Sequence, residues 1–358
     1  MKLRLLADDL TGALDSAAAF AGDVPVHLDA PPADDANAIG VVATASRDVA
    51  PASLPTVLTP SLGWLRGADI AFKKVDSLLR GNTFVEVAWL ARSGGFARTV
   101  FAPAFPQQGR LTVDGRLWLA PSAQRGAQCV SELSMAERLT NLGVPEPWVP
   151  DVRSDDDLQR IAALSLHSDS RHWLWCGSAG LAQALARALG LAASPAPLLA
   201  APSPLLLVSA SHHEVVRRQW AVLHTALPDV PLAVRGDAKM IDAVLSALRR
   251  PCKAALLDLA PANPLSSAAE ASALLARQLD VVVASAPRPG ALIVMGGDTL
   301  RALCRATGAR SLLSQASPRP GWGRARWVGG CWEGVECHSR SGAFGADDDL
   351  LSMISALS

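Results

Sequence analysis

The sequence predicts an α/β protein with two α/β domains, largely parallel sheets and an active-site cleft between the domains. Short apolar runs alternate with helical patterns from end to end, which is typical of βα units. The length of 358 residues suits about two domains. Four prolines punctuate residues 194–204, and proline at that density extends the backbone as linkers do. We therefore expect domains at residues 1–193 and 205–358.

The individual elements follow from the same patterns, taken in chain order. The apolar runs predict strands at Leu3–Leu6, Ala38–Ala43, Ile70–Lys73, Thr99–Ala102, Trp173–Trp175, Leu205–Ser209, Ala254–Leu259, Leu292–Met295 and Arg326–Val328. The helical patterns predict helices at Ala17–Phe20, Ser131–Leu142, Asp155–Leu164, Gly180–Leu189, Glu214–Leu227, Ala238–Leu248, Ser267–Ala284 and Thr299–Thr307.

Charge and composition exclude several classes of protein. The chain has 33 basic and 33 acidic residues without a basic stripe, which argues against nucleic acid and anionic membranes as partners. No signal peptide and no apolar run of membrane-spanning length is present, so we expect a cytoplasmic protein. The six cysteines include no C-x-x-C pair, and Cys331, Cys337 and His338 are too loosely spaced to indicate a metal site.

Two adjacent carboxylates, Asp8 and Asp9, follow the first predicted strand, and Asp15 comes soon after. The carboxyl edge of a parallel sheet is where ligands bind in α/β proteins. A metal, a cationic side chain or a polyol substrate would relieve the repulsion between the two acids. The simpler alternative is that one acid caps the following helix and the other is solvated.

A second polar string, residues 73–82, follows the strand at Ile70–Lys73. Lysine and arginine bind carboxylates, and acid and amide side chains can bind the hydroxyls of a small polar substrate. The alternative is a solvated turn whose charges pair with one another. The candidate binding residues of this string are Lys74, Asp76, Ser77, Arg80 and Asn82.

A third string, Pro103–Arg110, forms a loop constrained by prolines and glycine. Arg110 ends this loop, and Arg47 follows the strand at Ala38–Ala43. Strands of one parallel sheet end at the same edge, so these cations can converge with Lys74 and Arg80. Such a pocket would suit a small carboxylated molecule.

The second predicted domain carries three candidate phosphate-binding turns. Glycine lets the backbone approach a ligand closely, and the free N–H groups at a helix start bind phosphate. Neither a Walker A loop nor a G-x-G-x-x-G turn is present. A tight turn with Asp298 as N-cap is the alternative, and we expect His212 and His213 to be surface residues at a helix N-terminus. The candidate nucleotide-binding residues are Ser209, Ser211, Gly296, Gly297, Asp298, Thr299, Gly342 and Gly345.

Six motifs, in this order along nearly the whole chain, resemble those of the four-carbon acid sugar kinase family. That resemblance implies an N-terminal domain that binds the sugar acid and a C-terminal domain that binds ATP. The motifs are A-D-D-L-T-G-A-x-D at Ala7–Asp15, K-x-D-S-x-x-R-G-N at Lys74–Asn82, P-A-F-P-x-x-G-R at Pro103–Arg110, G-S-A-G-L at Gly177–Leu181, G-G-[DE]-T at Gly296–Thr299 and S-G-x-F-G at Ser341–Gly345.

This chain departs from the family pattern in the second domain. Ala210 stands where the family has glycine, and His212 and His213 replace a Cys-Ser pair. Arg340 stands for the usual lysine, and Ala343 stands for a second glycine. The chain is also shorter than typical members. These changes bear on how closely the backbone approaches phosphate.

The resemblance implies Mg²⁺-assisted transfer of the γ-phosphoryl group of ATP to the terminal hydroxyl of threonate, erythronate or a 3-oxo-tetronate. Arg47, Lys74, Arg80 and Arg110 would hold the carboxylate. Asp8, Asp9 and Asp76 would bind hydroxyls, with Asp9 as the expected proton acceptor and Asp8 as the alternative. The sequence assigns no metal ligand and leaves open both the particular acid and a homo-oligomeric state.

Two other functions remain open at this stage. A nicotinamide-dependent hydroxy-acid dehydrogenase would use the same polar pocket, although the missing dinucleotide motif argues against it. A catalytically silent sugar-acid-binding protein would keep the first domain and lose ATP use, and the Ala210 and Ala343 departures are its support.

Overall fold

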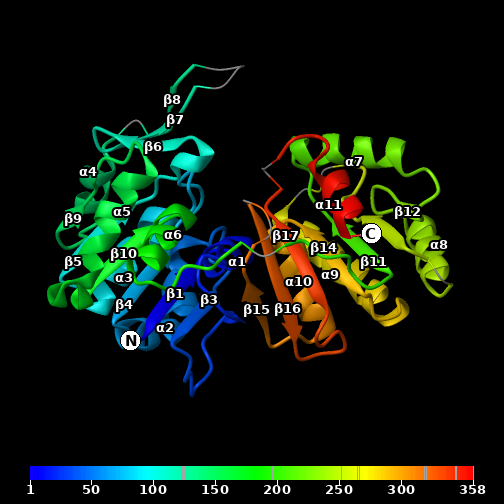
Figure 1. Ribbon diagram of the computed structural model, residues 1–358, viewed down its shortest axis with the longest axis horizontal. Coiled ribbons are helices and arrows are strands. Elements are labelled where there is room, and N and C mark those ends of the chain that lie inside the picture. The colour runs from blue at the N-terminus through cyan, green and yellow to red at the C-terminus, as the bar shows by residue number, and fades with distance from the viewer. Residues whose placement is uncertain are drawn as a thin grey trace. The chain divides into compact units, whose positions relative to one another are not determined.

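The computed structural model describes residues 1–121, 126–131, 133–195, 197–250, 252–263, 265, 267–317, 319, 321–342 and 345–357. The chain forms two compact units, unit 1 from Met1 to Ser194 and unit 2 from Pro195 to Ser358, and each is described by itself (Figure 1). The prediction of an α/β fold with largely parallel sheets is confirmed. Among the described residues, no helix has both the length and the apolar character that crossing a membrane requires.

The main sheet of unit 1 is parallel throughout, with the strand order β2-β3-β1-β4-β10-β5-β9. A smaller antiparallel sheet follows the order β6-β7-β8. The strands are β1 (Leu3–Ala7), β2 (Val24–Leu28), β3 (Ile39–Ala43), β4 (Ile70–Lys74), β5 (Arg98–Ala102), β6 (Arg110–Val113), β7 (Arg116–Leu119), β8 (Gln128–Cys129), β9 (Pro147–Trp148) and β10 (Trp173–Gly177).

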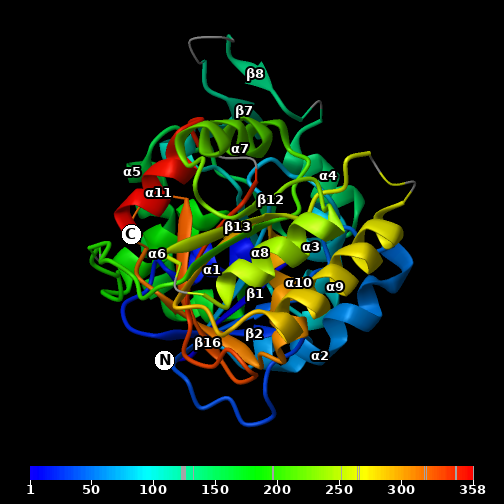
Figure 2. The same ribbon diagram turned by 90° about the vertical axis from the view of Figure 1, so that its right-hand side faces the viewer.

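Helices cover both faces of the main sheet of unit 1 (Figure 2). One core cluster joins alternate strand residues such as Leu6 and Ala71 to Leu58 of α2 and to Phe84 and Val87 of α3. Helix α6 packs with both α1 and α5 on the other face. The helices are α1 (Leu10–Ala17), α2 (Leu54–Arg66), α3 (Thr83–Gly94), α4 (Met135–Asn141), α5 (Asp155–Ala163) and α6 (Ala179–Ala188).

Unit 2 has a mixed sheet with the order β12-β13-β11-β14-β17-β16-β15. The pairs from β12 to β17 are parallel, and β16 pairs antiparallel with both β17 and β15. The strands are β11 (Leu205–Ser209), β12 (Leu232–Ala233), β13 (Ala254–Asp258), β14 (Ala291–Met295), β15 (Ser311–Gln315), β16 (Trp322–Val328) and β17 (Glu336–Arg340).

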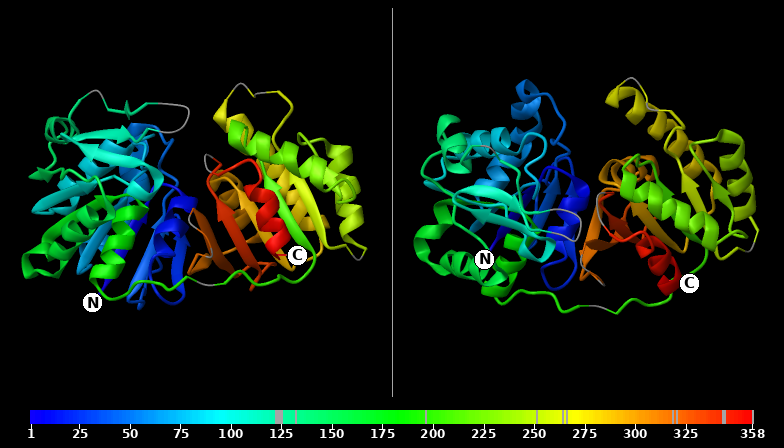
Figure 3. Two further views of the ribbon diagram at one scale, coloured as in Figure 1. Left: turned by 45° about the horizontal axis from the view of Figure 1, so that its top comes forward. Right: turned by 90° about the horizontal axis from the view of Figure 1, so that it is seen from above.

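Helices also cover both faces of the sheet of unit 2. On one face, α11 lies beside α7, and both pack on Leu207, Ile293 and Trp322 (Figure 3). Helix α10 packs with α9 on the other face. The helices are α7 (Glu214–Ala226), α8 (Ala238–Leu248), α9 (Ala268–Ser285), α10 (Gly297–Thr307) and α11 (Asp349–Leu357).

The predicted strands coincide with observed strands, although Arg326–Val328 is only the last part of β16. The helix predicted at Ala17–Phe20 is wrong, because α1 begins at Leu10 and ends at Ala17. Asp9 caps this helix by accepting a hydrogen bond from Gly12 N at 3.1 Å, so the helix begins directly after the strand.

Candidate functional site

Three neighbouring strands of unit 1 end at one edge and bring the predicted acids together. Ala7 at the end of β1 is in register with Ala43 of β3 and with Lys74 of β4. The residues that follow these strands therefore meet at the carboxyl edge, as the sequence predicts.

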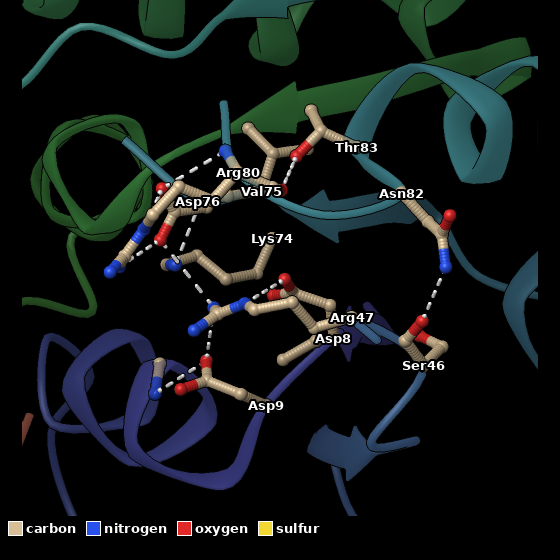
Figure 4. Close-up of polar contacts among 12 residues, drawn as sticks. Asp8, Asp9, Ser46, Arg47, Lys74, Val75, Asp76, Arg80, Asn82 and Thr83 are labelled. Carbon is tan, nitrogen blue, oxygen red and sulfur yellow. Dashed lines mark hydrogen bonds and ion pairs between the residues drawn. The ribbon is translucent and has the colours of Figure 1, made fainter. Parts of the chain in front are cut away.

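Arg47 bridges the three carboxylates that this edge collects (Figure 4). Its Nε lies 2.7 Å from Asp8 Oδ2, and its Nη2 lies 2.9 Å from Asp9 Oδ1 and 3.6 Å from Asp76 Oδ2. Asp9 caps α1, which agrees with the first half of the simpler alternative, that one acid caps the helix and the other is solvated. Asp8 is buried rather than solvated, and one guanidinium relieves the repulsion between the two adjacent acids.

Electrostatics keep Asp8 and Asp76 ionised. Burial raises the pKa of Asp8, but the charges of Arg47, Lys73 and Lys74 outweigh it and hold the pKa below its usual value. Burial likewise raises the pKa of Asp76, and hydrogen bonds from Arg80 with the charge of Arg47 drive it well below the usual range. Both side chains are therefore acceptors in the charged form.

Arg80 holds Asp76 through two parallel hydrogen bonds. Its Nε lies 3.0 Å from Asp76 Oδ1 and its Nη2 lies 2.6 Å from Oδ2. Arg80 is 44% exposed whereas Asp76 is 6% exposed. The charges of this turn therefore pair with each other, as the alternative has it, but Asp76 is shielded from solvent. An arginine with one side on a buried acid and the other open to solvent can still meet an anionic ligand. Ser77 lies half-buried beside this pair.

Lys74, Arg110 and Asp15 form the other side of the cluster. Lys74 Nζ donates to Val75 O at 2.9 Å, and a Cβ on Gly12 would lie 3.0 Å from it. Burial raises the pKa of Asp15 to about 6, opposed by the charges of Lys74 and Arg110. Burial lowers the pKa of Arg110, and the charges of Asp76 and Asp15 act against that. Asp15 therefore shares the electrostatic environment of the predicted site residues.

Asn82 does not face the charged cluster with its amide. Its Nδ2 donates to Ser46 O at 2.9 Å and to Val49 O at 2.6 Å, and its backbone N donates to Arg47 O at 3.2 Å. Gly81 has a φ of +65°, and a Cβ there would lie 2.5 Å from Arg47 O. These two residues position the loop that carries Arg47.

Backbone strain occurs in both loops of this cluster. Ala45, two residues before Arg47, has a φ of 52°, and Leu79, next to Arg80, has a φ of 60°. Left-handed conformations are unfavourable for residues with a Cβ, and they persist only where the surrounding structure holds them.

In unit 2, the predicted phosphate turn lines a pocket of about 240 Å³. The helix starts at Gly297 with Gly296 as N-cap, so Asp298 lies in the first turn and is not the cap. Gly296 has a φ of +98°, which favours glycine. The lining includes Ala210, Ser211, His212, Leu259, Pro261, Ala268, Ala271, Ser272, Leu274, Leu275, Gln278, Gly296, Gly297, Asp298 and Thr299.

The turn after β11 is joined to the start of α10. Ala210 N donates to Thr299 Oγ1 at 3.3 Å, and Ser211 N donates to Ser209 Oγ at 3.3 Å. Ala210 is not among the described residues with a positive φ, so its methyl group adds no backbone strain. His213 is the N-cap of α7, as predicted for a residue at a helix N-terminus.

The remaining predicted nucleotide residues, Ser209, Gly342 and Gly345, do not line this pocket. Ser209 is buried, and a Cβ on Gly342 would lie 2.8 Å from Ser211 Oγ. Gly345 has a φ of +97° and packs on the ion pair of Arg340 and Asp349. Ala343 lies outside the described residues.

Sequence reasoning missed three groups of residues. Thr11 Oγ1 donates to Asp9 Oδ2 at 2.7 Å. Its place in the same motif, two residues after Asp9, could have indicated this contact. The apolar wall of the unit 2 pocket comes from α9 and the residues after β13, where no motif marked it. Lys73 and Glu86 form a buried ion pair beneath the cluster. The sequence signal for it is that each charged residue stands among apolar residues of its own strand or helix.

The structure offers no group of three or more His, Cys, Asp or Glu side chains that could hold a metal, as far as the described residues extend. Cys331 is exposed and Cys337 is buried, and neither forms a disulfide. The polar groups able to contact an anionic ligand are the cations of unit 1 and the helix start of unit 2.

The fold and the two sites define a class of α/β proteins in which one unit carries a charged strand-edge site and the other a glycine-rich helix start. Residues 3–140 match the family described as "Sugar-binding N-terminal domain". A D-threonate kinase from Cupriavidus necator is 30% identical over an alignment of 378 positions, gaps included. The alignment covers 90% of this chain and 89% of the relative. A D-threonate kinase from Bordetella bronchiseptica is 27% identical and covers 99% of this chain and 96% of its own.

The chain belongs to the four-carbon acid sugar kinase family, and it is an enzyme of the kinase class. Two solved structures share its fold. A protein of Salmonella typhimurium LT2 has a TM-score of 0.74 at 17% identity, covering 99% of this chain and 98% of the other. A Haemophilus influenzae protein has a TM-score of 0.68 at 17% identity, covering 99% and 100%.

Proposed function

We propose that this protein is an ATP-dependent kinase that phosphorylates the terminal hydroxyl of a four-carbon sugar acid, with D-threonate as the first candidate. The observation that carries the proposal is the charged cluster at the carboxyl edge of β1, β3 and β4. Four cations and four acids gathered at one edge can bind a molecule that combines a carboxylate with several hydroxyls. The names of the relatives support the choice of threonate.

In unit 1, the cations bind the sugar acid and the acids orient it. The half-exposed Arg80, together with Lys74 and Arg110, would contact the carboxylate, while Arg47 holds the acids in place. Asp9 would accept the proton of the attacking hydroxyl. The side chain of Asp9 is 18% exposed whereas that of Asp8 is 5% exposed, which supports Asp9 in this role.

The pocket of unit 2 is suited to the polyphosphate and base of a nucleotide. The first-turn N–H groups of α10 at Gly297 and Thr299 would contact phosphate oxygens, and Ser211 lines the same pocket. Leu259, Pro261 and Leu275 supply an apolar surface for a base. Gly296 fits because its φ of +98° excludes most side chains.

Each predicted nucleotide residue has a place in this proposal. Asp298 in the first turn of α10 would lie near the metal or the ribose. Ser209, Gly342 and Gly345 would act by supporting the turn at Ser211 and the Arg340 side chain. When bound, Mg·ATP supplies the transferable phosphoryl group and neutralises its developing charge.

A coupled ADP-release assay with Mg·ATP tests the proposal against D- and L-threonate, D- and L-erythronate and 3-oxo-tetronates. We expect turnover with one of these acids and a phosphomonoester product by ³¹P NMR. Tartrate is the matched control, because it has two carboxylates and no terminal hydroxymethyl group. It should bind without being phosphorylated.

Three results would contradict the proposal. Folded protein that binds ATP but turns over none of these acids would point to another acceptor. Protein that binds the acids without any ATP effect would favour a silent binding protein. Hydroxy-acid-dependent reduction of NAD⁺ or NADP⁺, followed at 340 nm, would favour the dehydrogenase.

A further inference from the structure

A fully buried ion pair lies directly beneath the charged cluster of unit 1. Lys73 Nζ on β4 is 2.5 Å from Glu86 Oε2 on α3, and the two side chains are 1% and 0% exposed. Removing two charges from water is expensive, and a buried pair is often no more stable than an apolar pair of similar volume. The pair therefore calls for a role other than stability.

The register of β4 directs its two adjacent lysines to opposite faces of the sheet. Lys73 is paired with Leu6 of β1, and its strand neighbours Ala71 and Val75 pack in the core cluster with α3. Successive side chains of a strand alternate between faces, so Lys74 lies on the α1 face, beside Gly12. Asp8, two residues beyond Leu6, shares the face of Lys73.

Asp8 has one oxygen in the site and one facing the interior. Its Oδ2 accepts from Arg47 Nε at 2.7 Å. Its Oδ1 is buried, and among the described residues it has no hydrogen-bond partner. The charges of Arg47, Lys73 and Lys74 lower the pKa of this carboxylate. Burial raises the pKa of Glu86, and the charge of Asp8 adds to that rise.

The other groups that face Lys73 do not replace it in this role. Glu86 lies on α3, and the buried thiol of Cys176 on β10 is in register with Lys73. Burial raises the pKa of that thiol, so it stays protonated. Glu86 is the ion-pair partner of Lys73, and burial raises the pKa of its carboxyl group against the opposing charge of Lys73.

We propose that Lys73, neutralised by Glu86, is a positioning residue that holds Asp8 ionised and directed toward Arg47 and the sugar acid. This inference rests on the proposed function for the role of Asp8 in binding the acid. Without Lys73, the interior oxygen of Asp8 would face a buried carboxylate with no compensating charge. Asp8 would then take up a proton and present a hydroxyl donor where the substrate hydroxyl needs an acceptor.

The test uses a double variant, because Lys73→Met alone leaves Glu86 buried and unpaired. Lys73→Met/Glu86→Leu replaces the ion pair with apolar side chains and should fold. We expect its KM for the sugar acid to rise about tenfold or more. We also expect the acid limb of kcat/KM against pH to move up, by less than the loss of a lone cation would cause, because Glu86 is removed together with Lys73.

Two controls separate positioning from packing. Lys73→Arg keeps the charge and should restore most of the wild-type pH profile. Val87→Ala, at a fully buried neighbour of Glu86 on the same helix, should lower stability without moving the profile. A folded double variant with the wild-type KM and acid limb would overturn the proposal.

A readout without substrate keeps this test independent of the proposed function. A lowered pKa makes Asp8 stabilise the fold at neutral pH, and that contribution is lost as the pH falls. The difference in unfolding free energy between the parent and its Asp8→Asn derivative should therefore fall as the pH drops below about 4, the ordinary pKa of an aspartate in the unfolded chain. This fall should shrink in the Lys73→Met/Glu86→Leu background. An equal fall in both backgrounds would overturn the role of Lys73, whether or not the protein phosphorylates a sugar acid.

Discussion

Arg47 and Asp8 join the loop after β3 to the end of β1, with Nε 2.7 Å from Oδ2. The same guanidinium reaches Asp9 and Asp76, so one side chain neutralises acids that follow two different strands, β1 and β4. A planar, delocalised cation can do this, whereas a single ammonium group cannot.

Arg47→Lys should therefore fold less stably and bind the sugar acid poorly. We expect kcat/KM to fall about 100-fold, in line with the ~2–5 kcal/mol that truncating a buried charged hydrogen-bonding partner costs. Steady-state kinetics and urea unfolding measure the two effects. A lysine variant with wild-type kcat/KM would show that the bridge is not needed.

Arg80→Ala and Asp9→Asn should each abolish turnover while the protein remains folded. Arg80 is 44% exposed, so its loss removes a ligand contact more than core packing. Arg98→Ala is the matched control, because Arg98 is 41% exposed and pairs with Glu146 at 3.2 Å at the start of β5. ADP release and circular dichroism report on activity and folding. Near-wild-type rates in both site variants would contradict the site assignment.

Asp15→Asn should stabilise the protein at neutral pH. The pKa of Asp15 is raised to about 6, so ionised Asp15 destabilises the folded state above that pH. At pH 7.5 we expect a gain of about 1–2 kcal/mol, allowing for partial exposure, from the 1.4 kcal/mol that one pKa unit represents. The gain should vanish below pH 4, where both states bind the proton. Urea unfolding at the two pH values measures it, and a variant less stable at pH 7.5 would contradict it.

Gly81→Ala should cost more stability than Gly95→Ala, although both positions have a φ of +65°. The left-handed backbone costs each variant about 1–2 kcal/mol. Nothing lies within 4 Å of a Cβ at Gly95, whereas at Gly81 it would lie 2.5 Å from Arg47 O. Denaturant midpoints and KM for the sugar acid separate the two effects. Equal losses, with KM unchanged, would mean that Gly81 does not position Arg47.

Thr299→Val should weaken nucleotide binding and leave the KM for the sugar acid unchanged. The substitution removes the acceptor of Ala210 N, which joins the two turns of the pocket. We expect KM for ATP to rise about tenfold, the effect of about one lost hydrogen bond to a fixed group. Thr307→Val at the other end of α10 is the control, since its hydroxyl bonds Trp327 Nε1 away from the pocket. Unchanged nucleotide affinity in Thr299→Val would place the phosphates elsewhere.

The buried strands could be predicted from the sequence, and so could the convergence of the charged residues of unit 1 at one edge of the sheet. Runs such as residues 5–7 and residues 205–208 are apolar throughout because both faces of a parallel strand are buried. Strand ends then specify which side chains meet, which is how Asp8, Arg47 and Asp76 could be placed together without a structure.

Other features depend on tertiary contacts that no local pattern reveals. Pro25 and His27 interrupt the apolar pattern of β2. Strand β17 also contains polar residues, each with a partner: Glu336 pairs with Arg324 of β16, His338 with Glu336, and Arg340 with Asp349 of α11. The start of α1 was misplaced because Gly12 in its first turn reads as a loop residue. The partner of Lys73 could not be chosen from sequence, since pairing with Glu86 requires the packing of α3.

Lys73 and Lys74 point to opposite faces of the sheet, so the register of β4 must be correct to within one residue, although the composition of the strand does not show this. A shift of β4 by one position would still place a lysine on each face of the sheet. It would, however, exchange Ala71 and Val75 with Phe72 and break the match to α3. Insertions or deletions before β4 should therefore be tolerated only where the loop at Arg66–Asp69 absorbs them, so that natural length variation in this unit concentrates outside the strand.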